Sequence, residues 1–155
     1  MITTDTSMQI RRASEIERQA ILYRLQIEKM IWEDIHPERT RFFVAVEDQE
    51  LRGFIRYEPG YVHALFSSIY VDPEYATDGI QQRLVHHVEE KAKADRRRHL
   101  VCFSKNLGDF LTLMGYDEIV VGEGLRLIGD TPQGRWLKDQ THILTREICY
   151  QKVLM

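Results

Sequence analysis

Hydrophobic and polar residues in the middle of the chain change their spacing at one point. Residues 66–71, with the sequence FSSIYV, combine β-branched and aromatic side chains with a short polar pair, which is typical of a strand. This run stops at Asp72 and Pro73, because proline lacks the N–H group that a strand ladder requires. The pattern therefore predicts a strand that ends in a turn.

A helix is predicted directly after this turn. Beyond Gly79 the apolar residues recur with the spacing of one helix face, at Ile80, Leu84, Val88 and Ala92. A junction of strand, tight loop and helix points unpaired backbone N–H groups and the positive end of the helix dipole at one place. Such an arrangement is suited to binding a phosphate group.

The residues before this junction predict one or two helices and several strands. Ser14 followed by Glu17 is a capping-box pattern, which starts a helix at Glu15. Short apolar runs predict strands at 8–11, 42–47, 51–57 and 62–71. Only a short polar segment separates the second and third of these runs, so they are expected to form an antiparallel hairpin.

The residues after the helix predict a buried strand that crosses back to the sheet. Leu100–Phe103 is a short apolar run, and its connection through a helix implies that it lies parallel to the strand at 62–71. A short helix at 106–114 follows and stops at Gly115. Further strands are expected from Ile119 to Val121 and, at the end, over 147–154.

Three stretches, in this order, resemble the GNAT superfamily of N-acetyltransferases. Residues 50–55, ELRGFI, resemble the family's hairpin strand. Residues 71–84, VDPEYATDGIQQRL, are similar to its acyl-CoA pyrophosphate loop, and 110–116, FLTLMGY, are similar to the end of a later family helix. Together with the intervening elements, the resemblance covers about residues 8–120.

The resemblance implies an α/β (α+β) fold, with a mixed, mostly antiparallel central sheet flanked by helices and a parallel strand pair splayed at the cofactor site. The length of 155 residues fits one domain over residues 1–155, and the resemblance implies that this domain transfers an acetyl group from acetyl-CoA to a primary amine of a small molecule or peptide. The residues expected to hold the cofactor are Tyr70, Val71, Ala76, Thr77, Asp78, Gly79, Ile80 and Gln81.

Several residues depart from the family's pattern. Ala76 stands where a basic or amide side chain usually meets the pyrophosphate, and Asp78 adds a negative charge beside it. Gln81 occupies a position where Gly or Ala usually lets the backbone come close to the cofactor. Leu111 replaces the tyrosine proposed as the general acid. These departures support an alternative, a catalytically degenerate GNAT-fold domain that acts as an acyl-CoA sensor or a protein-interaction module.

His63 is the candidate for the base that deprotonates the amine. Side chains of a strand alternate between its two faces, so His63 shares a face with Leu65 and Ser67. The family often has a glutamate near Leu65, where this chain has none. The ordinary pKa of histidine, about 6.5, suits a base. The competing interpretation is a hydrogen-bonded strand histidine with a structural role.

The segment at about 122–146 lacks periodicity and is predicted to be a long loop inserted before the last strand. Two interpretations of this loop stand side by side. It caps an acceptor pocket, or it forms the surface of a homodimer.

Composition and charge exclude several classes of function. A net charge of −3 and an isoelectric point near 6.1 provide no general positive field for nucleic acid or a membrane surface. The basic run 96–99 is interpreted as cations that offset the dipole at a helix end. No run of about 18 apolar residues occurs, so a cytoplasmic protein without a membrane segment is expected. Cys102 and Cys149 are expected to be free, and no spacing predicts a metal site.

Overall fold

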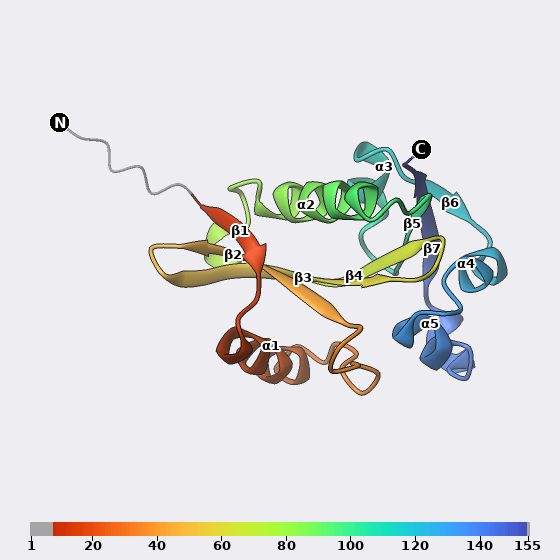
Figure 1. The fold of residues 1–155 in the computed structure, drawn as a ribbon, viewed down its shortest axis with the longest axis horizontal. Helices are drawn as coiled ribbons and strands as arrows, with labels where there is room; N and C mark the ends of the chain where they lie inside the picture. Colours follow the sequence, from red (N-terminus) through yellow and green to blue (C-terminus); the bar gives the residue numbers. More distant parts are fainter. Residues whose placement is uncertain (1–7, 155) are drawn as a thin grey trace.

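The computed structural model describes residues 8–154, which form a seven-stranded sheet with helices on both faces (Figure 1). The strands are β1 (Gln9–Arg12), β2 (Arg41–Glu47), β3 (Glu50–Pro59), β4 (Ala64–Val71), β5 (His99–Ser104), β6 (Asp117–Ile119) and β7 (Ile148–Val153). The helices are α1 (Glu15–Ile27), η1 (Pro73–Tyr75), α2 (Ile80–Ala94), α3 (Gly108–Leu113), α4 (Val121–Leu127), α5 (Pro132–Leu137) and α6 (Thr141–Leu144).

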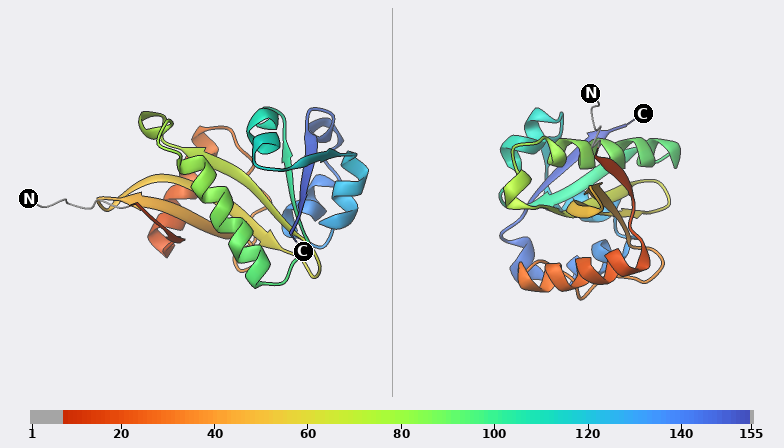
Figure 2. Two further views of the ribbon diagram at one scale, coloured as in Figure 1. Left: turned by 90° about the horizontal axis from the view of Figure 1, so that it is seen from above. Right: turned by 90° about the vertical axis from the view of Figure 1, so that its left-hand side faces the viewer.

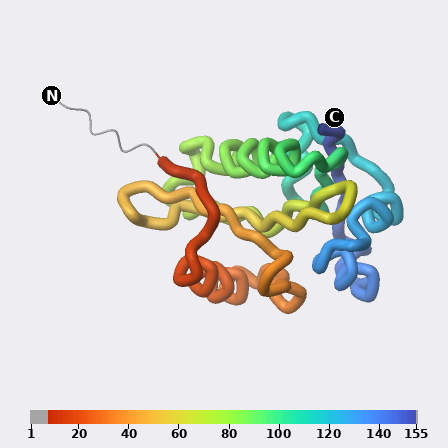
Figure 3. Tube along the Cα trace, in the orientation of Figure 1, coloured from red at the N-terminus to blue at the C-terminus, as the bar shows by residue number. Residues whose placement is uncertain are grey.

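The strand order across the sheet is β1-β2-β3-β4-β5-β7-β6. Neighbouring strands are antiparallel except β4 and β5, which are parallel and joined through α2. After β5 the chain passes through α3 and β6 before it returns as β7 between β5 and β6 (Figure 3). The predicted fold class, the antiparallel hairpin and the parallel crossover are confirmed.

Helix α1 begins at the predicted residue because its capping box is formed. The Ser14 hydroxyl accepts the N–H of Glu17 at 3.2 Å, and the Glu17 carboxylate accepts the N–H of Ser14 at 2.8 Å. Glu17 also pairs with Arg11 at 2.7 Å, and this hydrogen-bonded guanidinium lowers the pKa of Glu17 to about 2. The start of α1 is therefore tied to β1.

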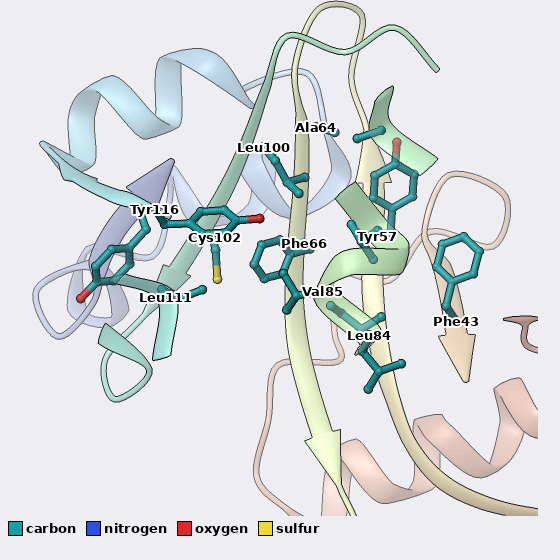
Figure 4. Packing of buried hydrophobic residues seen from close by; sticks show 14 of the residues in the cluster. Phe43, Tyr57, Ala64, Phe66, Leu84, Val85, Leu100, Cys102, Leu111 and Tyr116 are labelled. Atoms are coloured by element: carbon teal, nitrogen blue, oxygen red, sulfur yellow. The ribbon is translucent and has the colours of Figure 1, made fainter. Parts of the chain in front are cut away.

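The main hydrophobic core lies between the sheet and α2 (Figure 4). Helix α2 buries the four residues that the helical spacing predicted, Ile80, Leu84, Val88 and Ala92. Val85 beside them is buried as well. Phe66 on β4 and Tyr116, in the turn after α3, also belong to this core, and their rings meet edge to face with the centroids 5.7 Å apart. This packing fixes α2 along the sheet, so its N-terminus lies at the end of β4.

Two smaller hydrophobic clusters cover the opposite face of the sheet. Helix α1 contributes Ile21 and Leu25 to one of them, and the sheet contributes Phe42, Val44 and Phe54. The other joins β4, β5 and β7 to the end of α4, through Leu65, Val101, Cys149, Leu127 and Ile128. Figure 2 shows the sheet between α1 and α2 when it is viewed from one end.

Buried charges lie on the α1 face of β3. Arg56 and Glu58 are both 0% exposed, and the Nε of Arg56 donates to Glu58 at 3.0 Å. Arg56 also pairs with Asp34 at 2.8 Å. Glu58 accepts the hydroxyl of Thr40 and, at 2.9 Å, the backbone N–H of Gln133. One carboxylate thus joins β3 to the segment before β2 and to α5.

Two predictions are wrong after Gly115. The expected strand at Ile119–Val121 is displaced, because β6 covers Asp117–Ile119 and Val121 already starts α4. The segment expected to be a long loop contains the short helices α4, α5 and α6, of 7, 6 and 4 residues. Helices of this length hardly complete two turns, so they leave almost no periodic pattern. Thr131 before Pro132 is nevertheless a start signal, and its side chain caps α5.

We expect Glu58→Gln to lower the free energy of unfolding by about 3 kcal/mol, because it removes one of the two carboxylates that pair with the buried charge of Arg56. Urea unfolding at neutral pH measures the change. The matched control is Glu50→Gln on the same strand. The side chain of Glu50 pairs with Arg52 and is 69% exposed. This exposed pair is worth at most about 1 kcal/mol. Equal effects of the two substitutions would contradict the central role of Glu58.

Candidate functional site

Strands β4 and β5 separate after only two pairs of residues. The pairs are Ala64 with Leu100 and Leu65 with Val101. Beyond Leu65, β4 stays paired with β3, but within residues 8–154 its other side has no strand partner. Backbone N–H and C=O groups along that side are therefore available to a ligand.

A β-bulge bends β4 where the strands separate. Between the pairs Arg56–Ser67 and Phe54–Tyr70, one residue of β3 faces two residues of β4. One of these two, Ser68, has a φ of +54°, a conformation that residues other than glycine rarely adopt. A bulge adds a bend and extra twist to its strand, which explains why β4 turns away from β5.

A cleft of about 580 Å³ lies along the separated strands. Its walls come from β4, from β5 and the turn after it, from the segment after α1, and from α5 to the start of β7. The lining residues are 67–70, 102–107, 28–31, Gln133, Leu137, Ile143, Arg146 and Glu147. The volume is typical of a site for a small organic ligand.

The N-terminus of α2 is open at the end of β4. Gly79 is its N-cap, with a φ of +73°, and no side chain of the described residues caps the helix there. A methyl group at Gly79 would approach only the Oε1 of Gln82, at 3.9 Å, so the space beside the loop is free. The first N–H groups of a helix lack intrahelical acceptors and carry partial positive charge. This junction can therefore bind an anion, as predicted from its sequence.

The predicted cofactor residues of β4 lie where the strand borders the cleft. Tyr70 lines the cleft, and its ring stacks on Phe54 with the centroids 5.3 Å apart. Val71 ends the strand and packs against the main core.

The predicted loop residues lie beyond the cleft, since none of 76–81 belongs to its lining. Ala76, Thr77 and Asp78 are exposed, and Gln81 is half-buried in the first turn of α2. The side chain of Ile80 is buried in the main core, so only its backbone can face a ligand.

His63 lies at the opposite end of β4 from Tyr70 and does not line the cleft. It follows the turn after β3, and its ring packs against His99 with the centroids 4.6 Å apart. Burial lowers the pKa of His63, and the neighbouring His99 lowers it further. The structure does not bring His63 together with the cleft, so the geometry favours a different base.

Leu111, at the position of the family's tyrosine, is 0% exposed in the main core (Figure 4). It lies on α3 and has no polar atom to offer to the cleft.

Two features of the cleft were missed in the sequence. The Ser67–Ser68 pair fits an ordinary strand pattern, so the bulge had no local signal. Glu147 lines the cleft just before β7, and its burial raises the pKa of its carboxyl group. A carboxylate beside a long aperiodic segment was the only available signal for Glu147.

The sequence profile of the acetyltransferase (GNAT) family matches residues 8–109. This chain belongs to that family. The matched span includes β4, the loop, α2 and β5, and thus the strand edge and the open helix N-terminus. A search of curated protein sequences finds no significant match.

Several solved structures share the fold. A GNAT acetyltransferase from Staphylococcus aureus is 14% identical, with a TM-score of 0.72 over 96% of this chain and 100% of that one. N-acetylglutamate synthase from Neisseria gonorrhoeae, in complex with coenzyme A and N-acetylglutamate, is 18% identical, with a TM-score of 0.73 over 96% of this chain and 35% of that one. An aminoglycoside 6'-N-acetyltransferase in complex with coenzyme A is 13% identical, with a TM-score of 0.67 over 95% and 97%.

Residues 8–154 contain neither a membrane-spanning helix nor a cluster of metal-binding side chains. No helix there has the length and apolar character needed to cross a membrane. Nor do three or more His, Cys, Asp or Glu side chains of these residues gather in a way that would hold a metal ion.

We expect Gly79→Ala to lower the free energy of unfolding by about 1–2 kcal/mol, because a Cβ is strained at positive φ. The matched control is Gly122→Ala in the first turn of α4, where an added Cβ meets nothing within 4 Å. That change should be neutral or slightly stabilising, since alanine favours helix. Thermal unfolding of both variants checks the prediction, and an unaffected Gly79→Ala would contradict the strained cap.

We expect the free energy of unfolding to fall as the pH drops below about 6.5, partly because of His63. Its pKa is lowered in the folded state, so the unfolded chain binds the proton first and acid favours unfolding. Urea unfolding at pH 8 and pH 5.5 measures this. His63→Gln should lose less stability between these two pH values than the wild type. An equal or larger loss would show that the imidazole is not perturbed by folding.

Proposed function

We propose that this protein transfers an acetyl group from acetyl-CoA to a primary amine of a small molecule or peptide. The observation that carries the proposal is that an unpaired strand edge borders a cleft along β4, and that an open helix N-terminus follows at the end of the same strand. Membership of the acetyltransferase (GNAT) family supports the same class of reaction.

The free edge of β4 suits the pantetheine arm of the cofactor. An extended ligand with amide groups can add to a sheet edge through main-chain hydrogen bonds. Residues 66–71 present such an edge on the side where β5 has turned away. In this proposal Tyr70 and Val71 contribute their backbone groups, and the ring of Tyr70 forms part of the wall.

The open N-terminus of α2 suits the pyrophosphate. The backbone N–H groups of Gly79, Ile80 and Gln81 stand in the turn where the helix dipole is positive. Ala76 and Asp78 are exposed and offer a methyl group and a carboxylate in place of a cation. Binding at this loop therefore depends on backbone dipoles more than on side-chain charge.

Acetyl-CoA supplies an acyl group that is already activated as a thioester. The protein has to position the amine against this acyl group and to accept a proton from the amine. Leu111 is buried and apolar, so it cannot donate a proton to the leaving thiolate. Since general acid catalysis typically contributes about 10²- to 10⁴-fold in rate, slow turnover is expected.

The burial of Leu111 in the core also favours a second candidate function, an acyl-CoA sensor that binds the cofactor without turnover. The two functions share the strand edge and the helix N-terminus. They differ in whether an amine bound in the cleft is acetylated, which releases coenzyme A as a free thiol.

We expect acetyl-CoA to raise the melting temperature, because a ligand selective for the folded state stabilises it, by about 2.7 kcal/mol at 100 times its Kd. Differential scanning fluorimetry measures this, and Gln81→Gly should enlarge the shift by removing side-chain bulk at the loop. Thiol release with a panel of primary amines then separates transferase from sensor. The absence of any shift at millimolar acetyl-CoA would overturn both functions, and binding without thiol release would favour the sensor.

A further inference from the structure

The cleft wall before β7 carries a carboxylate with an unsatisfied oxygen. Glu147 lines the cleft, and its Oε2 is buried without a hydrogen-bond partner among residues 8–154. Burial raises the pKa of Glu147, and the charge of Lys105 opposes this effect. Buried polar atoms are nearly always hydrogen-bonded in native proteins. Oε2 therefore lacks a donor, and a rotation of the carboxylate is what turns it toward a ligand in the cleft.

A second unsatisfied oxygen belongs to the same cleft. Ser67, on β4 directly before the bulge, is 8% exposed, and its Oγ has no partner among the described residues. Ser67 and Glu147 reach the cleft from different walls, one from the strand beside the acyl-CoA edge and one from the segment before β7. The walls of the cleft thus contain two oxygens without a hydrogen-bond partner among the described residues.

The other charged side chains of the cleft are exposed to solvent: Glu28, Lys29, Lys105 and Arg146. The thiol of Cys102 on β5 also lies near Glu147, and burial raises its pKa, so it remains protonated and neutral. Glu147 is therefore the least exposed charged group that lines the cleft. Apolar side chains from α5 and α6, Leu137 and Ile143, stand on the same wall.

We propose that Glu147 binds the ammonium group of the acceptor and takes up its proton before acyl transfer, with the Oγ of Ser67 as a second acceptor. The inference rests on the proposed function and names the acceptor's class, a primary aliphatic amine on an apolar stem. An alkylammonium has three N–H donors and no acceptor, which matches two unsatisfied oxygens. Leu137 and Ile143 provide the apolar surface for the stem.

The proton and electron pairs balance in this scheme. The carboxylate of Glu147 removes one proton from R–NH₃⁺ and leaves a neutral amine with a free electron pair. The amine nitrogen forms a bond to the thioester carbonyl carbon, and the C–S bond breaks with the sulfur keeping its electron pair. The nitrogen then loses a second proton, which yields the amide, and the thiolate gains one. Glu147 returns its proton to solvent.

The first test follows thiol release from acetyl-CoA with n-hexylamine between pH 6.5 and 8.5. Once Glu147 is ionised the ammonium form reacts, so kcat/KM of the wild type should reach a plateau above the pKa of Glu147. In Glu147→Gln only the free amine reacts, so kcat/KM should rise about tenfold per pH unit below the amine's pKa of about 10.4. At neutral pH it should fall about 10²- to 10⁴-fold. Glu147→Asp should restore a plateau.

The matched control is Glu90→Gln on α2, which makes the same charge change at a side chain that is 75% exposed and outside the cleft. It should keep the wild-type profile. Acetyl-CoA should raise the melting temperature of Glu147→Gln as much as that of the wild type, since the cofactor's contacts are untouched. A Glu147→Gln variant with the rate and pH profile of the wild type would overturn the inference while leaving the proposed function intact.

The second test does not depend on turnover. The carboxyl group of Glu147 is titrated by ¹³C NMR, with and without n-hexylammonium chloride. The cation should lower the pKa of Glu147, because a nearby opposite charge favours the ionised form, and hexan-1-ol should not. An unchanged titration with the cation would overturn the inference. If acetyl-CoA fails to bind, the proposed function fails, and this titration still decides whether Glu147 recognises an amine.

Discussion

The early separation of β4 from β5 is the constraint on which the rest of the structure depends. Parallel neighbours joined by a crossover helix ordinarily share a ladder of hydrogen bonds, yet here only two residue pairs form. The bulge at Ser68 turns β4 aside, and α2 then begins at the far end of the turned strand. The free edge of β4 consequently borders the cleft, and the N-terminus of α2 follows beyond it at the end of the same strand. A regular β4 would have closed this space by pairing with β5.

A gap of this kind needs walls that do not collapse into it. Glu58 holds together β3, the segment before β2 and α5 through the hydroxyl of Thr40, the guanidinium of Arg56 and the backbone of Gln133. Burying such charges has a desolvation penalty that their attraction roughly offsets, so the network contributes little net stability. The network instead fixes the position of the cleft wall, because Gln133, whose backbone N–H it binds, lines the cleft.

Features that depend on neighbours in sequence were predictable, and features that depend on long-range placement were not. The cap at Ser14, the buried face of α2 and the glycine at 79 each follow from a few adjacent residues. Period-two spacing says which face of β4 His63 occupies but not that the cleft lies at the other end of the strand. Glu147 reaches the cleft only because β7 enters the sheet beside β5.

The place of β7 also bears on how the chain assembles during synthesis. Among the described strands, β6 pairs only with β7, and the outer edge of β5 is covered by β7 as well. A nascent chain that has emerged through β6 can form the meander β1–β4, but it leaves two strand edges open. Open edges of this kind invite pairing with other chains and are natural targets for chaperones. The wall that carries Glu147 depends on β7, so a chain stalled before β7 exposes these edges and has no finished cleft.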